Sequence, residues 1–345
     1  MNRVLVAGAS GYAGALTAEL VRRHPNLELV RVSARTDAGR RLDELYPRYG
    51  VDLVLEEPST GDGDDVDAAI VAYPHGAAAP VVAALRERGV KVVDLSADFR
   101  LRDIETYHRT YGDHGAPELL ASAVYGLPEL HREAIEGADL VANPGCYPTA
   151  SLLALAPLAA EGLIEDVVID AKSGVSGAGR AAMAEMAVVK ETDETRPYKV
   201  VGHRHTPEIA EQLAGLEANT NRVAADGAPS HHAPALTFTP HLMPYDQGEL
   251  VSCYVRTREP LDAGRLLALY QGRYSSEAFV DVSPDPPGVS GVRDTNLCRI
   301  HVAFDEASGR ALSFASIDNL WKGAASQAIQ NLNLMLGLPE GEGIS

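Results

Sequence analysis

A chain of 345 residues is longer than one hydrophobic core usually organises, so we expect two domains. Its formal net charge of −18 argues against a general affinity for nucleic acid, which is itself a polyanion. No apolar run reaches the ~20 residues that span a bilayer, and the N-terminus leads directly into a strand rather than a signal peptide. The 3 cysteines are widely spaced without a CxxC pair, which predicts a cytoplasmic protein with neither a disulfide framework nor a structural zinc site.

The chain begins with a pattern that is typical of a dinucleotide site. Residues 3–7 predict a buried parallel strand, and residues 15–23 predict a helix that Pro25 ends. The turn between them has the spacing GxxGxxG, and its glycines allow backbone N–H groups to approach a pyrophosphate at the helix N-terminus. The residues expected at the cofactor are Gly8, Ser10, Gly11, Tyr12, Ala13 and Gly14. A tight turn without a ligand is the alternative.

The second predicted strand, residues 28–32, ends in side chains that suit a 2′-phosphate. A site that prefers NAD usually carries an acidic residue there, which accepts a hydrogen bond from the ribose 2′-hydroxyl. Ser33 and Arg35 stand at this position instead and favour NADP. Asp37 lies close enough to keep NAD open, and Arg35 as ordinary surface charge is the other interpretation.

Strands and helices continue to alternate along the first half. Residues 68–72 and 90–94 predict strands, and residues 77–88 predict a helix between them. Residues 101–136 are irregular, and we expect helices and a loop over the site there.

Polar turns follow both of these strands. In a doubly wound sheet, ligands gather beyond the carboxyl ends of the strands, so we expect Pro74 and Ser96 to line the cofactor site. Arg100 could bind a carboxylate or phosphate of the substrate, because its planar guanidinium suits either group. An ion pair of Arg100 with Asp98 or Asp103 is the alternative.

Cys146 is the candidate nucleophile. It lies in the segment 143–149, between a short apolar run and the helix pattern of residues 150–160. A turn at the positive end of a helix dipole lowers the pKa of a thiol, and the thiolate is the form that attacks carbon. The alternative is a buried cysteine that packs as a small apolar group, which is our interpretation of Cys253 and Cys298.

A glycine- and serine-rich loop, residues 172–180, follows the predicted strand 167–171 and precedes a predicted helix at 181–190. Such a loop exposes backbone donors and suits an anionic ligand, whereas a flexible linker is the alternative. The substrate is expected at Ser173 and Gly174, and the cofactor at Ser176 and Gly177.

Two histidines precede the next helix. His205 is the candidate acid/base partner of Cys146, and His203 is a candidate substrate ligand. Histidines two residues apart on a loop, without a matching cysteine or carboxylate cluster, are weak metal ligands, so we expect no metal. As a structural alternative, His205 or Thr206 caps the helix, with Pro207 at its first position.

The rest of the chain predicts an α+β domain. A polar loop at 220–234 carries His231 and His232, which we expect to be exposed. Mainly antiparallel strands are expected at 235–241, 248–258, 278–282, 297–304 and 311–315, with a helix at 261–272. An amphipathic helix at 321–336 should pack back on the first domain and bring Asn319 to the cofactor.

Seven motifs in order give the chain a family resemblance: GASGYAG at 8–14, AYPHG at 72–76, LSADFR at 95–100, NPGCYPT at 143–149, SGVSGAGR at 173–180, GHRHTPEI at 202–209 and IDNLWKG at 317–323. Together they resemble the N-acetyl-γ-glutamyl-phosphate reductases of arginine biosynthesis over essentially the whole chain.

The resemblance implies a Rossmann-type doubly wound parallel sheet over residues 1–145, which binds NADP(H) and is completed by the C-terminal helix at 318–345. Residues 146–317 would form an α+β substrate and oligomerisation domain similar to that of glyceraldehyde-3-phosphate dehydrogenase. Cys146 matches the nucleophile of the family, His205 matches its acid/base histidine, and Asn319 matches a position that contacts the cofactor. We therefore expect a homo-oligomer, either a dimer or a tetramer.

The implied reaction is NADPH-dependent reduction of N-acetyl-γ-glutamyl phosphate to N-acetylglutamate 5-semialdehyde. The Cys146 thiolate attacks the acyl carbon, phosphate leaves, and hydride reduces the resulting thioester, with His205 as the proton carrier and the helix start as the oxyanion site. A phosphorylating dehydrogenase for aminoadipyl or aspartyl phosphate is an alternative, and an NADP-binding sensor without turnover is another.

Overall fold

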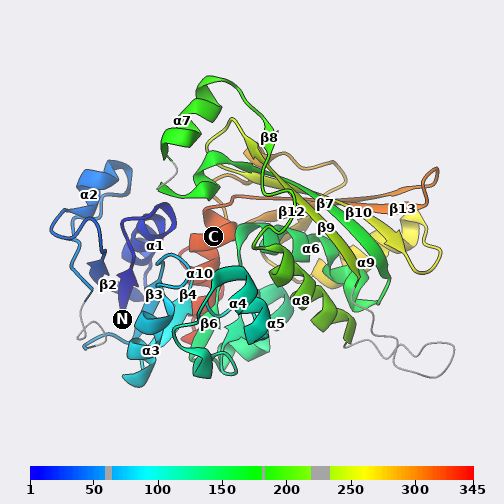
Figure 1. Cartoon of the computed structure of the whole chain (residues 1–345). Coiled ribbons are helices and arrows are strands. Elements are labelled where there is room, and N and C mark those ends of the chain that lie inside the picture. Colours follow the sequence, from blue (N-terminus) through cyan, green and yellow to red (C-terminus); the bar gives the residue numbers. More distant parts are fainter. Residues whose placement is uncertain (59–63, 181–182, 219–233) are drawn as a thin grey trace. The chain divides into compact units, whose positions relative to one another are not determined.

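The structure is a computed structural model that describes residues 1–58, 64–180, 183–218 and 234–345 (Figure 1). The chain divides into two compact units. Unit 1 comprises Met1–Gly145, Ala178–Ala181 and Leu320–Ser345, and unit 2 comprises Cys146–Gly177 and Ala182–Asn319. His231 and His232 lie outside the described residues.

Unit 1 is built on a sheet whose strands all run parallel. Within the described residues the sheet has 6 strands in the order β2-β1-β3-β4-β6-β5. The strands are β1 (Asn2–Ala7), β2 (Leu27–Ser33), β3 (Ala68–Val71), β4 (Lys91–Asp94), β5 (Val124–Tyr125) and β6 (Leu140–Ala142). The predicted doubly wound parallel sheet is confirmed. The two-residue strand β5, within the segment predicted to hold only helices and a loop, was too short for its sequence pattern to reveal.

The helices of unit 1 are α1 (Tyr12–Arg23), α2 (Leu42–Leu45), α3 (Ala79–Glu87), α4 (Ile104–Tyr111), α5 (Pro128–Glu136) and α10 (Ser326–Met335), with the single turns η1 (Pro47–Tyr49), η2 (Pro117–Leu119) and η6 (Trp321–Ala325). The C-terminal helix predicted at 321–336 therefore begins as the π-helical turn η6 and continues as α10. This last segment packs against α1, β4 and α5, although it lies far from them in the sequence.

Apolar side chains of the strands form the core of unit 1. Leu5, Val71 and Val92 from three neighbouring strands belong to one buried cluster with Val82 and Leu85 of α3. Central strands covered on both faces need apolar side chains at consecutive positions, which is why their sequences are nearly continuous apolar runs.

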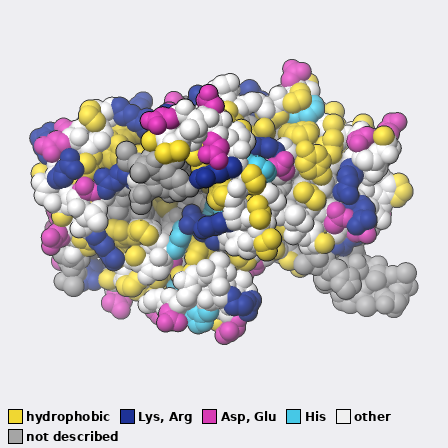
Figure 2. Space-filling view, turned by 45° about the horizontal axis from the view of Figure 1, so that its top comes forward, with side chains coloured by type: hydrophobic (Ala, Val, Ile, Leu, Met, Phe, Trp, Pro, Cys, Tyr) yellow, Lys and Arg dark blue, Asp and Glu magenta, His cyan; other side chains and the backbone are white. Residues whose placement is uncertain are grey.

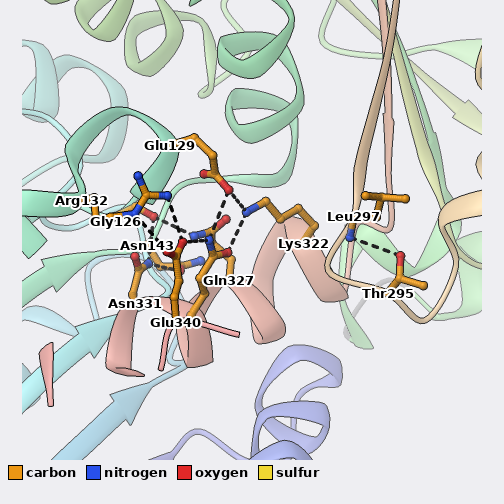
Figure 3. A network of polar contacts seen from close by, with 11 residues as sticks. Gly126, Glu129, Arg132, Asn143, Thr295, Leu297, Lys322, Gln327, Asn331 and Glu340 are labelled. Carbon is orange, nitrogen blue, oxygen red and sulfur yellow. Dashed lines mark hydrogen bonds and ion pairs between the residues drawn. The ribbon is translucent and has the colours of Figure 1, made fainter. Parts of the chain in front are cut away.

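A network of polar side chains is buried between α5 and the C-terminal segment (Figure 3). Lys322 donates to Glu129 at 2.6 Å and to the amide oxygen of Gln330 at 2.7 Å. The side chain of Lys322 is 0% exposed and that of Glu129 is 1% exposed. At the rim, Arg132 pairs with Glu340 of the C-terminal tail at 3.0 Å. The network ties the end of the chain to α5 by charge as well as by packing.

Unit 2 is built on a mixed sheet. Over the residues that the structure describes, it has 7 strands in the order β11-β12-β13-β10-β7-β9-β8. The strands are β7 (Ile164–Gly174), β8 (Arg196–Pro197), β9 (Ala235–Met243), β10 (Glu249–Thr257), β11 (Val280–Val282), β12 (Cys298–Asp305) and β13 (Arg310–Ile317). The pairs β7–β9 and β11–β12 are parallel and the others are antiparallel, as the prediction of mainly antiparallel strands requires.

The helices of unit 2 are α6 (Cys146–Ala160), α7 (Met183–Glu191), α8 (Thr206–Ala218) and α9 (Ala263–Tyr274), with the turns η3 (Val175–Ala178) and η5 (Val289–Val292). No helix within the described parts of the chain is long and apolar enough to cross a membrane.

Helix α6 is the buried centre of unit 2 and packs against β10, β13, α8 and α9. It is apolar on all sides, as a helix surrounded by protein must be. Pro157 lies within it and lacks the N–H that would bond to the carbonyl of Leu153. The hydroxyl of Tyr274 donates to that carbonyl at 2.6 Å instead. A side chain of α9 thus replaces the hydrogen bond that proline removes.

Candidate active site

Cys146 is the first residue of α6, at the start of unit 2. It is partly exposed, whereas Cys253 and Cys298 are fully buried. Burial raises the pKa of the Cys146 thiol, and Glu249 raises it further in its carboxylate form; the Tyr147 backbone N–H and Arg204 act in the opposite direction. The net direction is upward, so the lowered thiol pKa expected from the helix end alone is wrong: burial, the largest contribution, and Glu249 outweigh the Tyr147 N–H and Arg204.

The turn before Cys146 is held by several hydrogen bonds within unit 1. Arg100 donates from Nε to the carbonyl of Asn143 at 2.8 Å and from a terminal nitrogen to the carbonyl of Leu95 at 2.7 Å. Asn331 of α10 donates to the side-chain oxygen of Asn143 at 3.0 Å (Figure 3). Arg100 is buried, and these two bonds make it a brace between the 95–100 turn and the 143–145 turn. Its expected role as a substrate ligand stays a prediction.

Aromatic rings gather next to Cys146 in unit 2. The ring of Tyr147 lies 5.9 Å from His203, 5.9 Å from His205 and 5.3 Å from Phe238, measured between ring centroids. The hydroxyl of Tyr198 lies 3.3 Å from that of Tyr147. We call these five residues the Tyr147 cluster. The cluster brings the predicted acid/base histidine into the neighbourhood of the predicted nucleophile.

The two histidines of the cluster differ in what their rings can do. The backbone N–H of His205 donates to Nδ1 of His203 at 3.2 Å, so this nitrogen is an acceptor. Burial, with Arg204 and Lys199 nearby, lowers the pKa of His203 to about 4, which leaves it neutral at pH 7. The carbonyl of His205 accepts the N–H of Ile209 in the first turn of α8. His203 therefore orients His205, and its expected role as a substrate ligand stays a prediction.

Glu249 is a site residue that the sequence analysis missed. It is the first residue of β10, where it pairs with Ser173 of β7 and Ile317 of β13. Its side chain is completely buried next to the Cys146 thiol, and neither carboxyl oxygen has a hydrogen-bond partner among the described residues. Burial, opposed in part by the nearby thiol and reinforced by Asp318, raises the pKa of Glu249 to about 8.

A signal for Glu249 was present in the pattern of its strand. Along β10 the buried positions alternate, with Val251, Cys253 and Val255 all at 0% exposure. Glu249 continues this alternation by two residues, so the period of the strand places a carboxyl on the buried face. A charged residue at such a position needs a reason other than stability.

The glycine- and serine-rich loop is more ordered than predicted. Residues 172–174 continue β7, and η3 follows. The N–H groups of Gly174, Val175 and Ser176 donate to the carbonyls of Gly248, Tyr245 and Asp246, in that order. These three backbone donors are used within unit 2, which corrects the expectation that they face an anion.

Ser173, Gly174, Ser176 and Gly177 are positioned with Asn319. A Cβ on Gly174 would lie 2.7 Å from the carbonyl oxygen of Asp246, so this turn excludes a side chain there. Asn319 accepts the N–H of Gly248 at 2.7 Å and donates to the hydroxyl of Ser176 at 2.9 Å. Ser173 and Gly177 are close neighbours, because a Cβ on Gly177 would lie 3.0 Å from the Ser173 hydroxyl.

The glycine turn between β1 and α1 fits a dinucleotide. Gly8 has φ +86°, and a Cβ there would lie 2.6 Å from the carbonyl of Ala72. A Cβ on Gly14 would collide with the carbonyl oxygen of Gly8, so both glycines are needed by the packing. Gly11 caps α1, and nothing lies closer than 3.8 Å to its missing Cβ. That open backbone at a helix N-terminus is what close approach of a pyrophosphate requires.

The other residues expected in this turn support it structurally. The carbonyl of Ser10 accepts the hydroxyl of Tyr46 at 2.9 Å, and the Tyr46 ring meets Tyr12 edge to face at 6.1 Å. The carbonyl of Ala13 accepts the hydroxyl of Thr17 at 2.8 Å within α1.

The end of β2 carries charge of both signs. Ser33 is fully buried, with its hydroxyl 3.1 Å from that of Tyr73, and its expected role at the cofactor stays a prediction. Arg35 lies over the Tyr73 ring, 5.2 Å from the ring centroid. Asp37 forms an ion pair with Arg180, and this bond lowers the pKa of Asp37. The carboxylate that left NAD open is thus neutralised within unit 1.

The two polar turns after β3 and β4 are joined to each other. The hydroxyl of Ser96 donates to Asp94 at 2.6 Å and accepts the N–H of Asp98 at 3.0 Å. Asp98 in turn accepts the N–H of Gly76 at 2.7 Å, and the carbonyl of Pro74 accepts the N–H of Ala77 at 3.0 Å. Pro74 and Ser96 therefore lie on one braced edge at the carboxyl ends of neighbouring strands.

Two family models match the chain in sequence order. The NAD-binding domain of semialdehyde dehydrogenase matches residues 3–138, and the semialdehyde dehydrogenase dimerisation domain matches residues 146–319. An N-acetyl-gamma-glutamyl-phosphate reductase from Moorella thermoacetica is 44% identical over 99% of this chain and 97% of its own length. The reductase of that name from Alkalilimnicola ehrlichii is 45% identical over 100% and 98%. The chain belongs to the N-acetyl-γ-glutamyl-phosphate reductases of the semialdehyde dehydrogenase family.

Solved structures of the wider family share the fold of this reductase-family chain. Aspartate semialdehyde dehydrogenase II from Vibrio cholerae, complexed with ASA, has a TM-score of 0.74 at 19% identity and covers 98% of each chain. The Candida albicans aspartate semialdehyde dehydrogenase with NADP has a TM-score of 0.70 at 15% identity, covering 97% of this chain and 98% of its own. At these identities the likeness shows the fold.

The described residues of this family member contain no metal-binding cluster, and the face in Figure 2 carries charges of both signs. Among the described residues, no group of three or more His, Cys, Asp and Glu side chains could hold a metal ion. Acidic and basic side chains are both spread over the face shown in Figure 2, so the net charge of −18 does not form one continuous acidic surface there.

Proposed function

We propose that this chain reduces N-acetyl-γ-glutamyl phosphate to N-acetylglutamate 5-semialdehyde, with release of phosphate, in arginine biosynthesis. The observation that carries the proposal is full-length similarity to reductases of this name, together with a partly exposed cysteine at the start of a buried helix. The sensor alternative does not account for a cysteine with a histidine of the same unit in its neighbourhood.

Cys146 is the proposed nucleophile. Its sulfur forms a bond to the acyl carbon, the bond from that carbon to the phosphate oxygen breaks, and a thioester remains. The N–H groups of the first turn of α6 have no carbonyl partner within the helix, and they are the proposed donors to the developing oxyanion. A thioester is readily reduced because sulfur is a better leaving group than an alkoxide.

His205 is the proposed carrier of the proton. As a base it takes the proton of the Cys146 thiol, and as an imidazolium it returns a proton when the aldehyde is released. His203 is neutral and accepts the backbone N–H of His205, which favours a fixed orientation of the partner ring. This division of labour requires one titrating histidine only.

The proposed cofactor is NADP(H), which when bound supplies the hydride for the thioester carbon. Gly11 and the first turn of α1 would receive the pyrophosphate. The 2′-phosphate would be held near Arg35, because Arg180 neutralises the acidic residue that would otherwise repel it, Asp37. Asn319, Ser176 and Gly177 are proposed to contact the cofactor, as the family resemblance implies.

We further propose that the chain works as a cytoplasmic homo-oligomer. Unit 2 matches a domain described as a dimerisation domain, and the cysteines of the chain are unpaired. The two units would then divide the work, with cofactor binding in residues 1–145 and 318–345, and catalysis and assembly in residues 146–317.

The test is phosphate-dependent NADP reduction with N-acetylglutamate semialdehyde, compared with the semialdehydes of aspartate and aminoadipate. We expect the acetylated substrate to be preferred in kcat/KM, and NADP over NAD. A preference for either of the other semialdehydes would reject the arginine-pathway assignment. Intact-mass measurement of enzyme mixed with the acyl phosphate and no reduced cofactor should show one acyl group on Cys146; its absence would reject the covalent route.

A further inference from the structure

The carboxyl of Glu249 lies next to the Cys146 thiol and has no hydrogen-bond partner in the part of the chain that the structure describes. Glu249 is 0% exposed, and both of its carboxyl oxygens are buried. The thiol is near enough to contribute to the pKa of Glu249. Glu249 is the first residue of β10, Cys146 is the first residue of α6, and the two elements pack against each other.

The charges around Glu249 disfavour its ionised form. No Lys, Arg or His forms an ion pair with it among the described residues, and the acidic group that acts on it is Asp318, which follows β13. Its strand neighbours, Ser173 and Ile317, do not titrate near neutral pH. A buried carboxylate without a cation is costly, and the group stays protonated instead.

Three tyrosines and one arginine also act on this site. Tyr147, Tyr198 and Tyr245 all interact with Glu249, and burial raises the pKa of each, to about 12 for the last two. These phenols are neutral at working pH and cannot neutralise a carboxylate. Arg204 acts on Cys146 and lowers its pKa, so the cation in this neighbourhood favours the thiolate.

We propose that Glu249 is a catalytic hydrogen-bond donor, whose neutral carboxylic acid donates its O–H to the Cys146 sulfur and stabilises the thiolate. The proposal rests on the proposed nucleophilic role of Cys146. The thiol proton passes to His205, so the S–H bond breaks and an N–H bond forms, while the O–H bond of Glu249 stays intact. When the thiohemiacetal collapses, the leaving sulfur receives the same donor.

This role gives the enzyme an alkaline limit. Below the pKa of Glu249, which burial sets at about 8, the acid supports the thiolate; above it, the carboxylate repels the thiolate. The kcat and the rate of Cys146 alkylation should therefore both fall as the pH rises above this pKa, and the cause would be Glu249 rather than His205.

The experiment compares Glu249→Gln, Glu249→Leu and the wild type. Gln keeps a donor but cannot titrate, and Leu removes the donor. Glu165→Gln, an exposed glutamate of β7 that pairs with Arg256, is the matched control. For each protein, kcat and the rate of Cys146 alkylation by iodoacetamide are measured from pH 6 to 10; the alkylation rate is read by peptide mass spectrometry and needs no turnover.

At pH 7 we expect Glu249→Gln to keep kcat within about threefold, and Glu249→Leu to lose about 10- to 100-fold in kcat and in alkylation rate, the effect of a hydrogen bond to a charged group. At pH 9 the wild type should have lost about tenfold from its optimum, since about a tenth of an acid remains protonated one unit above its pKa. Glu249→Gln should not show this alkaline loss.

Three results would overturn the inference. The first is a loss of kcat on the alkaline side that Glu249→Gln retains. The second is a Glu249→Leu protein with the wild-type kcat and alkylation rate. The third is a Glu249→Gln protein that is inactive at pH 7, which would mean that the carboxylate acts as a base. Circular dichroism and thermal melting check folding. Cys146→Ser separates the two proposals. If this variant turns over at the wild-type rate, the covalent route itself is rejected. If it is inactive while the Glu249 variants keep the wild-type kcat and pH profile, only the role of Glu249 is rejected.

Discussion

Glu129 and Glu249 are both buried glutamates, and their surroundings give them opposite protonation states. Burial disfavours a charge on Glu129, but the Lys322 ammonium and the Gln330 amide outweigh burial, so the pKa of Glu129 lies below its ordinary value. Glu249 has a thiol and another carboxylic residue beside it, and burial raises its pKa to about 8. The first is an ionised anchor of unit 1, and the second is a neutral acid at the candidate active site of unit 2.

The comparison teaches that the partner, rather than the burial, decides what a buried carboxyl does. A cation at 2.6 Å makes Glu129 part of a fixed network that includes the C-terminal segment. A thiol as partner leaves Glu249 able to respond when the sulfur changes its charge. Four changes test this contrast.

The largest expected effect comes from removing the sulfur. Cys146→Ser should fold and bind NADPH but lose kcat by on the order of 10⁴-fold, because a hydroxyl is a far weaker nucleophile at pH 7. Steady-state rates and cofactor titration by fluorescence measure both quantities. A Ser variant within tenfold of the wild type would show that no cysteine adduct is required.

Breaking the ionised pair should act on stability instead. Lys322→Met leaves the buried Glu129 carboxylate without its ammonium partner, and should lower the free energy of unfolding by about 3–5 kcal/mol. The double variant Lys322→Met/Glu129→Leu should recover most of this loss, because it leaves no buried charge. Urea denaturation of the single and double variants gives the coupling. If the single variant were as stable as the wild type, Glu129 would not be ionised in the folded protein.

The two glutamates should also respond to pH with opposite signs. Glu129, with a lowered pKa, contributes stability above its unfolded pKa and loses it as pH falls through the folded value. Glu249, with a raised pKa, contributes stability below its unfolded value near 4.5 and loses it as pH rises towards 8.

Glu249→Leu should accordingly gain stability relative to the wild type as pH rises from 5 to 8, by at most about 4 kcal/mol. Urea midpoints at several pH values measure the difference, with Glu165→Gln as the control. A difference that does not change with pH would show that Glu249 does not titrate in this range.

The smallest of the four effects is expected at His205. His205→Asn should lower kcat by about 10²-fold, with cofactor affinity unchanged, because the thiol then loses its base. This variant sharpens the contrast between the two glutamates, because a neutral Glu249 cannot replace His205 as the base. A variant with normal kcat and weakened cofactor binding would make His205 a binding residue.

Local patterns in the sequence were sufficient to predict the fold class. The glycine turn between β1 and α1, the alternation of strands and helices, and the ordered motifs predicted a parallel dinucleotide-binding sheet and a second α+β domain, and both are confirmed. These features follow from short-range rules of periodicity and turn geometry. Strand β5 was missed because two residues carry no period.

The partners of polar side chains were harder to predict. Arg100 could be expected to meet an anion, and it donates to the carbonyls of Leu95 and Asn143. The loop after residue 172 was rich in backbone donors by composition, and three of them bond to carbonyls of the 245–248 turn. Apart from the bond between Arg100 and Leu95, these pairings join residues 43 to 74 positions apart in the chain, where no local pattern operates.

The sequence by itself determined the architecture of this reductase-family protein and singled out its cysteine, because glycine turns, apolar periods and helix starts are local physical signals. Only the tertiary structure decided the charge of its buried groups. Glu129 and Glu249 are the same residue in the sequence, and the protonation of each depends on which side chain the fold brings against it. Electrostatic free energy depends on distance and burial in space, and neither can be read from position along the chain.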